Sequence, residues 1–386
     1  MFLAVALAAQ LTACTKSQET PTKEGFVRAD GTGLVLDGRS YRFHGLNYYD
    51  INTYAGEDPF HPGTRHLVGC RFHSEVPRIA ESLGRIGAAA NALRGWFFQP
   101  FVTSVPLGGG PSRRDWSVFD RTLAAVRQAH MRIIVTLGDH FGNCERPPNP
   151  KSIDWYRFGY KTEVPARQLE PYRSYVADVV TRYRDHPEIL AWQLVSEAMI
   201  FNKGGKGCDE LAAMNALRAF ADDVGGLIHS LDHNHLVSLG TGSSGCGIEG
   251  PRRAHYAHVF SSPGIDLCEY HDYYEPTHRI PQILAQELDI CGSLLEKPLF
   301  IGETGIRASD AGQACPAGQF PACRARLLNA KFRAQFRGSS HGYAEDVVGE
   351  LVWDWCENAW TPCKPTEWDI VPGDPVLLAL ASLPTS

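Results

Sequence analysis

The chain has 386 residues, of which 44% are hydrophobic and 21% charged, so it can fill a large core and keep a soluble surface. Its formal net charge is −6 and no block of basic residues occurs, which argues against a nucleic acid as partner. No internal repeat, low-complexity tract or second hydrophobic domain appears along it. We therefore expect one domain over residues 25–386, and we expect a monomer.

The N-terminus has the character of a processing segment. Residues 2–13 form an apolar run that is too short to cross a bilayer as a permanent helix. The run ends in Leu11-Thr12-Ala13-Cys14, which resembles the bacterial lipoprotein signal, although no Lys or Arg lies between Met1 and the run. This resemblance implies a signal peptide over residues 1–14, lipidation at Cys14 and a polar tether over 15–24. The protein would then be exported, either anchored to the cell envelope by that lipid or secreted.

The segments that follow alternate between two patterns. Residues 26–37 predict a short hairpin at the bottom of the domain, and after it short β-rich apolar runs alternate with amphipathic stretches. Strands are expected at 41–47, 88–96, 132–138, 188–197, 236–241, 265–271, 298–303 and 346–355. Helices are expected at 75–86, 116–130, 170–185, 209–231, 280–295 and 322–337, with the weakest pattern in the fifth crossover near 249–260.

Eight strands in βα alternation predict a parallel sheet covered by helices, and eight such strands close into a (β/α)₈ TIM barrel. An open, doubly wound sheet is the alternative. It would need a glycine-rich phosphate turn after the first strand, where this chain has GLNYYD. We therefore expect an α/β fold, a single TIM barrel with long loops.

Cysteine usage agrees with export. The chain has 11 cysteines, and removal of Cys14 leaves an even number. None has the close paired spacing of a zinc ribbon, so disulfides are favoured over a metal site. The sequence does not fix the pairing, and Cys315 with Cys323 and Cys356 with Cys363 are only local candidates.

Reactive groups in such barrels lie at the carboxyl ends of the strands, where a polar side chain is costly to bury without a purpose. The segments LAWQLVSE and PLFIGE each end in a carboxylate, Glu197 and Glu303 respectively. The other candidates at strand ends are Asn47, Arg94, His140, His271, Tyr273, and Trp353 or Trp355. Asn47 and His140 are the weaker ones, since each is as often an ordinary hydrogen-bonding residue of a loop or core. Four aromatic residues either stack on sugars or pack in the core: Tyr48, Tyr49, Trp96 and Trp155.

Two carboxyl groups that face one cleft are what cleavage of a glycosidic bond requires. One of them, kept protonated, donates a proton to the leaving oxygen, and the other, ionised, attacks the anomeric carbon. A separation of roughly 5–5.5 Å gives retention through a covalent intermediate. We expect mutual repulsion to help hold one of the two pKa values high. Strands four and seven lie across the barrel from each other, so the two groups can converge at its mouth.

These segments resemble glycoside hydrolase family 5, from about Phe26 onward. FVRADGTGLVLDGRSYRFHGLNYYD is similar to the opening of the family's β-mannanases, and NALRGW, the His-Asp-Tyr of residues 271–273, PLFIGETG and GELVWDW are similar to its motifs on strands two, six, seven and eight. The resemblance implies that Glu197 is the acid/base and Glu303 the nucleophile.

The same resemblance implies supporting roles for other residues. Arg94 and Tyr273 would hold Glu303 ionised and oriented, and His271, less surely with His140, would shape the subsite. Trp353 is favoured over Trp355 as the residue that stacks on the cleaved sugar.

Strand four departs from the family's pattern, because Ser196 precedes Glu197 where the family has Asn. That Asn binds the sugar 2-hydroxyl, and a Ser is shorter and donates only one hydrogen bond. Three readings follow: a water bridges the gap, the substrate presents a different group, or the protein is a weak or inactive relative.

Other chemistry finds little support. His229, His233 and His235 surround Asp232, but only His229 and His233 share a helical face and no Glu accompanies them as in a zinc protease. The chain has no P-loop, no dinucleotide fingerprint and no GxSxG motif, so we expect no metal and no cofactor.

The sequence therefore predicts a retaining endo-β-glycosidase that acts on a β-linked polysaccharide, with β-mannan favoured and β-glucan next. The alternative from another class is a carbohydrate-binding surface lipoprotein on the same barrel that has lost turnover through Ser196.

Overall fold

Eight parallel strands form the centre of the protein in a computed structural model, which describes residues 24–53, 64–66, 79–145, 148–166, 168–200, 208–242, 244–273, 280–316, 318–337, 347–357 and 362–385. In chain order the strands are β4 (Phe43–Asn47), β6 (Ala92–Trp96), β9 (Arg132–Thr136), β10 (Ile189–Gln193), β11 (Leu236–Ser238), β12 (Cys268–Asp272), β13 (Leu299–Thr304) and β14 (Gly349–Val352). Each overlaps one of the strands expected from the sequence.

The strands close into a ring. Their hydrogen-bonded order is β11-β10-β9-β6-β4-β14-β13-β12, so consecutive strands are neighbours and β14 returns to pair with β4. Between the two remaining ends, Ser238 and Leu267 form a parallel bridge, and the backbone N–H groups of Asp266 and Leu267 donate to the Val237 carbonyl at 2.8 and 3.1 Å. The expected TIM barrel is therefore confirmed.

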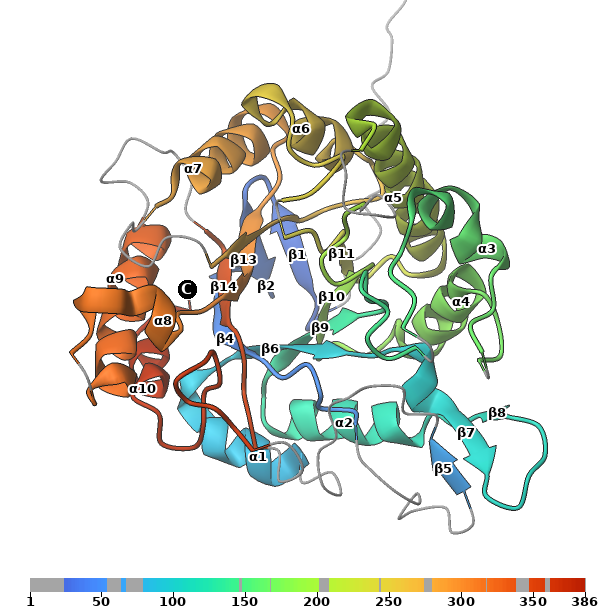
Figure 1. Cartoon of the computed structure of the whole chain (residues 1–386), viewed down its shortest axis with the longest axis horizontal. Helices are drawn as coiled ribbons and strands as arrows, with labels where there is room; N and C mark the ends of the chain where they lie inside the picture. The colour runs from blue at the N-terminus through green and yellow to red at the C-terminus, as the bar shows by residue number, and fades with distance from the viewer. Residues whose placement is uncertain are drawn as a thin grey trace, which may run out of the picture.

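A ring of helices surrounds the strands (Figure 1). It consists of α1 (Ile79–Ile86), α2 (Ser117–Gln128), α4 (Tyr172–Tyr183), α5 (Glu210–Leu231), α6 (Ala254–Phe260), α7 (Gln282–Asp289) and α9 (Phe320–Arg337). Each covers the barrel with an apolar stripe; in α2 the buried residues recur at helical spacing, at Val118, Phe119, Thr122, Leu123 and Val126.

Several smaller elements had no clear pattern in the sequence. They are the turn of π-helix at Trp155–Gly159, the short helices α3 (Tyr160–Thr162), α8 (Ala308–Ala311) and α10 (Val376–Ala381), and a small sheet of β5 (Thr64–His66), β7 (Thr103–Pro106) and β8 (Arg113–Arg114). They are short insertions in the loops, and too few residues in each repeat a spacing to reveal it.

The bottom of the barrel is closed by the first segment of the chain. β1 (Val27–Asp30), β2 (Gly33–Leu36) and β3 (Arg39–Tyr41) form an antiparallel sheet, which is the expected hairpin with one further strand. Val27 and Leu34 are buried in one apolar cluster with residues from the amino-terminal halves of the barrel strands, among them Phe43 and Phe300. The apolar cluster thus covers this end of the barrel in the described part of the chain.

Among the residues that the structure describes, nine cysteines are disulfide-bonded. The pairs are Cys208–Cys246, Cys268–Cys291, Cys315–Cys323 and Cys356–Cys363, and Cys144 is bonded as well. Both local pairs expected from the sequence are present. Cys14 and the rest of residues 1–23 lie outside the described residues. Within the described part of the chain, no helix combines the length and apolarity needed to cross a membrane.

Candidate active site

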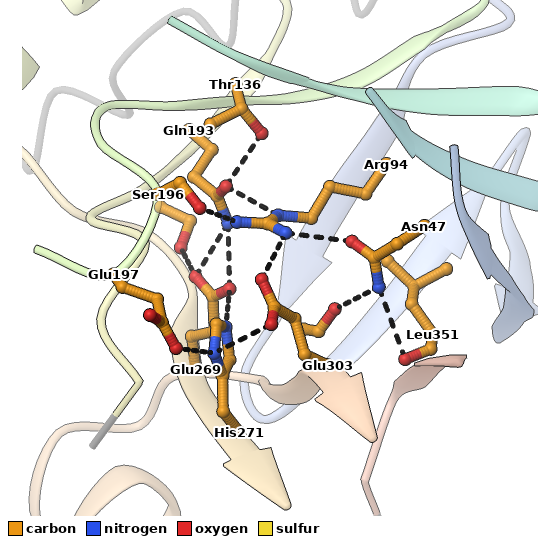
Figure 2. A network of polar contacts seen from close by, with 12 residues as sticks. Asn47, Arg94, Thr136, Gln193, Ser196, Glu197, Glu269, His271, Glu303 and Leu351 are labelled. Carbon is orange, nitrogen blue, oxygen red and sulfur yellow. Dashed lines mark hydrogen bonds and ion pairs between the residues drawn. The ribbon is translucent and has the colours of Figure 1, made fainter. Parts of the chain in front are cut away.

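One buried arginine connects four strands at the open mouth of the barrel. The Arg94 guanidinium on β6 donates to the Asn47 side-chain oxygen (2.8 Å), to Glu303 Oε1 (2.6 Å), to Ser196 Oγ (2.9 Å) and to Gln193 Oε1 (2.7 Å), as Figure 2 shows. Its side chain is fully buried. A planar group with five N–H donors can bond all four partners at once, which an ammonium cannot do.

A second layer of polar side chains lies below this arginine. Gln193 Nε2 donates to both carboxylate oxygens of Glu269 at 2.8 and 2.9 Å, and Ser238 Oγ donates to Glu269 Oε2 at 2.6 Å. Thr136 Oγ1 donates to Gln193 Oε1 at 2.8 Å. These residues face the inside of neighbouring strands, so the barrel interior at this level is a hydrogen-bonded network rather than an apolar core.

Two glycines make room for this arrangement. A Cβ on Gly302 would lie 2.1 Å from Glu269 Oε1, and a Cβ on Gly305 would lie 2.7 Å from the Trp368 ring. The strand that carries Glu303 can therefore approach Glu269 and Trp368 only with glycine at both positions.

The two carboxylates predicted from the sequence meet at the mouth. One oxygen of Glu197 and one oxygen of Glu303 lie within 4.8 Å of each other. Glu303 is 5% exposed and Glu197 27% exposed, so Glu197 is the more open of the two to solvent. Tyr273 donates its hydroxyl to Glu303 Oε2 at 2.8 Å, while Arg94 occupies Oε1. Both oxygens of Glu303 are thus held, and its orientation is fixed.

His271 connects the two carboxylates. Its Nδ1 lies 3.2 Å from Glu197 Oε1 and 3.5 Å from Glu303 Oε2, and its Nε2 lies 3.3 Å from Glu269 Oε1. Burial disfavours the charged imidazolium, but the negative charges of Glu303, Glu197 and Glu269 outweigh it and raise the pKa of His271 to about 10. At neutral pH both ring nitrogens of His271 are therefore protonated, and the ring places a positive charge between the two acids.

The pKa values of the two carboxyl groups are shifted in opposite directions, and the group with the raised pKa is not the one expected to donate a proton. Burial, together with the charge of Glu197, raises the pKa of Glu303 despite the opposing effects of His271 and Arg94. The pKa of Glu197 is lowered, because the hydrogen bond and charge of His271 outweigh its partial burial. In the unliganded protein the carboxyl with the raised pKa is thus Glu303. The reason is that Glu303 is more deeply buried than Glu197, although both line the pocket.

An open pocket of about 330 Å³ lies over these groups, at the lower end of the size range of ligand sites. Its lining is formed by five carboxyl residues, by Asn143 and Ser196, and by aromatic rings; in full it is Tyr49, Trp96, Asp139, Phe141, Asn143, Ser196, Glu197, Glu303, Trp353, Asp354, Trp368 and Asp369. This mixture of acids and flat apolar rings suits a sugar, which has hydroxyl groups around its edge and C–H groups on its faces.

The aromatic candidates divide into two groups. Trp353 lines the pocket and stacks in parallel on Tyr49, with ring centres 4.9 Å apart, whereas Trp355 is fully buried in the core. Trp96 also lines the pocket. Tyr48 and Trp155 are buried away from this pocket: the hydroxyl of Tyr48 donates to Ser82 and Trp155 packs among aromatic rings.

Asn47 and His140 lie outside the pocket lining. Asn47 is fully buried and donates to the Gly302 carbonyl at 2.9 Å, so it supports Arg94 and β13 from behind. His140 is also fully buried, and burial lowers its pKa to about 4, which keeps the ring neutral. Its neighbour Asp139, which the sequence did not single out, reaches the pocket instead.

Ser196 lines the pocket with its hydroxyl oxygen already accepting from Arg94. The single O–H of this side chain is therefore free to donate toward a bound group, while the oxygen stays fixed by the arginine. Ser196 therefore offers one rotatable donor at the position where family 5 has Asn.

The histidines considered for a metal site have other partners. His235 Nδ1 contacts Asp232 at 2.6 Å, and His229 contacts Asp266 at 3.3 Å. Within the described residues, Glu197, His271 and Glu303 are close enough to share an ion. The raised pKa of His271 and the donors on both oxygens of Glu303 make this trio a poor cation site.

No family model matches the chain. It is 25% identical over 371 residues to mannan endo-1,4-β-mannosidase 1 of Oryza sativa subsp. japonica, which covers 85% of this chain and 78% of that protein. The solved endo-1,4-β-mannanase of Rhizomucor miehei matches with a TM-score of 0.60 and 16% identity, over 92% of this chain and 97% of that one. A glycoside hydrolase family 5 mannosidase from the same organism, solved with mannosyl-fructose, matches with a TM-score of 0.58 and 15% identity, over 92% and 96% of the two chains.

These comparisons confirm the resemblance expected from the motifs. The chain is a relative of the mannan endo-1,4-β-mannosidases, and its barrel is that of solved family 5 structures.

The Arg94 network makes a prediction about stability. Arg94→Met leaves Glu303 buried without its guanidinium, so the free energy of unfolding should fall by about 3–5 kcal/mol at pH 8. The pKa of Glu303, already raised by burial, rises further without Arg94. The folded variant then holds a proton that the unfolded chain releases at lower pH, so the deficit should shrink at pH 5.

Denaturant unfolding of wild type and variant at both pH values measures this effect. The control is Arg182→Met, whose side chain and that of its partner Asp120 are each 43% exposed, and it should change stability by only about 0–1 kcal/mol. A deficit for Arg94→Met below 1 kcal/mol at both pH values would contradict the role given to the network.

Proposed function

We propose that the protein is a retaining endo-β-1,4-mannanase, with Glu197 as acid/base and Glu303 as nucleophile. The observation that carries this proposal is the approach of the two carboxyl groups to within 4.8 Å at the open mouth of the barrel. Retaining enzymes hold their pair about 5–5.5 Å apart, whereas inverting enzymes leave roughly 6.5–9.5 Å for a water molecule. The relationship to mannan endo-1,4-β-mannosidases supports β-mannan as the substrate.

The hydrogen bonds support this division of roles. Glu303 receives N–H and O–H donors on both oxygens, which fixes it for attack on the anomeric carbon. Glu197 keeps part of its surface open to the pocket, where the leaving oxygen and later the attacking water must reach it. In this reaction Glu303 forms a bond to the anomeric carbon as the glycosidic bond breaks, and the proton of Glu197 goes to the leaving oxygen.

Substrate binding itself moves the protons toward the productive state. A sugar in the pocket removes water from Glu197, and this loss of solvation raises the pKa of that carboxyl group. The positive charge that develops at the anomeric carbon favours the ionised form of Glu303.

The covalent intermediate then reverses the demand on Glu197. Its Glu303 is a neutral ester, and the proton on His271 favours Glu197 as a carboxylate. Glu197 can therefore take a proton from the water that releases the sugar.

Loss of turnover through Ser196 is the alternative, and the site geometry does not favour it. Arg94 holds the Ser196 oxygen at 2.9 Å, which leaves its O–H able to turn toward a bound group beside Glu197. The position therefore keeps one donor, and the relationship to mannan endo-1,4-β-mannosidases supports an active enzyme.

We also propose that the protein is exported. The nine disulfide-bonded cysteines support an oxidising compartment. Acylation at Cys14, with residues 1–14 as signal peptide and 15–24 as tether, is the form of export that we propose.

The activity is tested by incubating wild type, Glu197→Ala and Glu303→Ala with β-1,4-mannan, β-glucan and xylan, and measuring reducing ends. Wild type should release most from mannan, and each variant should lose at least about 1,000-fold in rate, because each lacks one of the two groups that make or break bonds. ¹H NMR of the first product should show the β anomer. Binding of mannan without hydrolysis by wild type, or release of the α anomer first, would contradict the proposal.

The position of His271 predicts a change in the pH profile. Its proton lowers the pKa of Glu197 and opposes the rise in that of Glu303. In His271→Asn both pKa values should therefore rise, and both limbs of the bell-shaped kcat/KM profile should move to higher pH, by about one unit.

The profile is measured on a soluble manno-oligosaccharide. His186→Asn, a half-exposed histidine paired with Glu188, serves as the control and should leave the profile in place. A profile for His271→Asn that is unmoved or displaced to lower pH would show that the imidazolium does not set these pKa values.

A further inference from the structure

A second pair of carboxyl groups lines the pocket beyond the catalytic pair. Asp354 follows β14, and Asp369 belongs to the segment that returns beside it. The backbone N–H of Ile370 donates to the Asp354 carbonyl at 2.7 Å, and that of Cys356 donates to the Ile370 carbonyl at 2.9 Å. Trp355 and Ile370 thus form a parallel bridge.

This bridge determines where the acids point. Successive side chains of extended backbone alternate between two faces. Trp355 and Ile370 are opposite each other and both are fully buried in the core. Asp354 and Asp369, each one residue earlier, therefore share the opposite face, and this face is the wall of the pocket.

The hydrogen bonds of the described residues give the Asp354 side chain no structural role. It is 5% exposed, yet no other side chain of the described residues donates to its carboxyl group. Burial, and then the charges of Asp369, Asp50 and Glu303, raises the pKa of Asp354 well above its usual range. The carboxyl group of Asp354 accepts from its own backbone N–H. A buried acid with so few donors is costly, unless a bound group supplies further hydrogen bonds.

A donor lies beside this pair. The Trp368 Nε1–H is buried without a hydrogen-bond partner among the described residues, and Trp368 lines the same pocket. Its ring is fixed by the Arg307 guanidinium above it at 4.4 Å and by an edge contact with Tyr273 at 5.7 Å. The carboxyl groups of Asp354 and Asp369 can accept further hydrogen bonds and the Trp368 N–H can donate one. All three groups lie in the pocket that Trp353 also lines.

The segment that carries these groups is firmly anchored. Arg324, which is fully buried, donates to the carbonyls of Glu367 (3.0 Å) and Asp369 (3.1 Å) and to the Asp374 carboxylate at 2.5 Å. Asp369 Oδ2 accepts from the backbone N–H of Lys364 at 2.7 Å. The groups are therefore preorganised and do not require a loop to close on the ligand.

We propose that Asp354, Asp369 and Trp368 form a sugar-binding subsite next to the cleaved sugar, which binds hydroxyl groups of an adjacent neutral hexose and sets the specificity of the cleft. The inference rests on the proposed function for its substrate class. The carboxyl groups accept from sugar hydroxyls and the indole N–H donates to a sugar oxygen. Within the described residues no Lys or Arg lines this pocket and five carboxyl residues do, so its lining offers a uronic acid no cationic partner.

Binding and turnover are measured separately to test the subsite. In the Glu303→Gln background, which lacks the nucleophile, calorimetry gives the Kd of mannohexaose with and without Asp354→Ala, Asp354→Asn and Asp369→Asn. We expect about 10- to 100-fold weaker binding for Asp354→Ala, and a partial recovery for Asp354→Asn, because its amide keeps one acceptor. Glu367→Ala removes an exposed carboxylate from the same segment and should bind like the parent.

Turnover of mannohexaose by the same substitutions in the active enzyme should show a raised KM with kcat within about threefold. A fall in kcat with unchanged KM would indicate distortion of Glu303 and overturn the subsite. Thermal unfolding of each variant identifies loss of fold. If the Asp354 variants do not fold, the Kd and KM of Asp369→Asn test the subsite instead.

The choice of ligand tests the chemistry of the subsite. Oligomers of mannuronic acid should bind at least 10-fold more weakly than mannohexaose. Equal binding of the two, or tighter binding of glucosamine oligomers, would overturn the neutral-sugar assignment. If wild type hydrolyses mannan while Asp354→Ala and Asp369→Asn bind mannohexaose like the parent, only this inference fails. If mannohexaose binding depends on Asp354 but wild type hydrolyses no polysaccharide, the subsite stands and the proposed function fails.

Discussion

The site depends on one buried ion pair, between Arg94 and Glu303. A guanidinium with no exposed surface needs a counter-charge and a partner for each N–H group, and Glu303, Asn47, Gln193 and Ser196 supply them from four positions at the barrel mouth. The same contacts that satisfy the arginine fix the carboxylate and the hydroxyl that we assign to the chemistry. Stability and function therefore share one set of hydrogen bonds.

A second consequence concerns the proton on His271. Three carboxylates, of Glu197, Glu269 and Glu303, surround this imidazole, and Glu269 is itself held by Gln193 and Ser238. The charge that the network places between the acid pair favours the base form of Glu197, which the second half of a retaining reaction uses. The first half needs the opposite form, and exclusion of water by the sugar supplies it. Glu197, Glu303 and His271 titrate together, so the pKa values in the pH profile describe the three groups jointly and not any one residue.

The sequence predicts the frame of the protein well, because barrel strands and covering helices repeat a strong apolar pattern. It also locates Glu197 and Glu303 at the ends of apolar segments and Arg94 inside one, since a polar residue is unexpected at each of these positions. Gln193 and Glu269 carry the same signal, a polar residue in a buried strand, but they precede the predicted strand ends and so are not marked as part of the site. Asp354, Trp368 and Asp369 were not predictable: their meeting depends on a loop that returns beside β14, and no periodicity encodes that return. The sequence also does not predict that the pKa of Glu303 is raised and that of Glu197 lowered, because both shifts depend on how deeply each group is buried.

Trapping the glycosyl-enzyme tests the central claim most directly. A 2-fluoro β-mannosyl or manno-oligosaccharide donor with a good leaving group slows breakdown of the intermediate, and peptide mass spectrometry then locates the sugar. Our account predicts one label per chain, on the Glu303 side chain in the PLFIGETG segment. A label on any other residue would contradict the assignment of the nucleophile, and inversion without a trapped sugar would contradict the two-step mechanism itself.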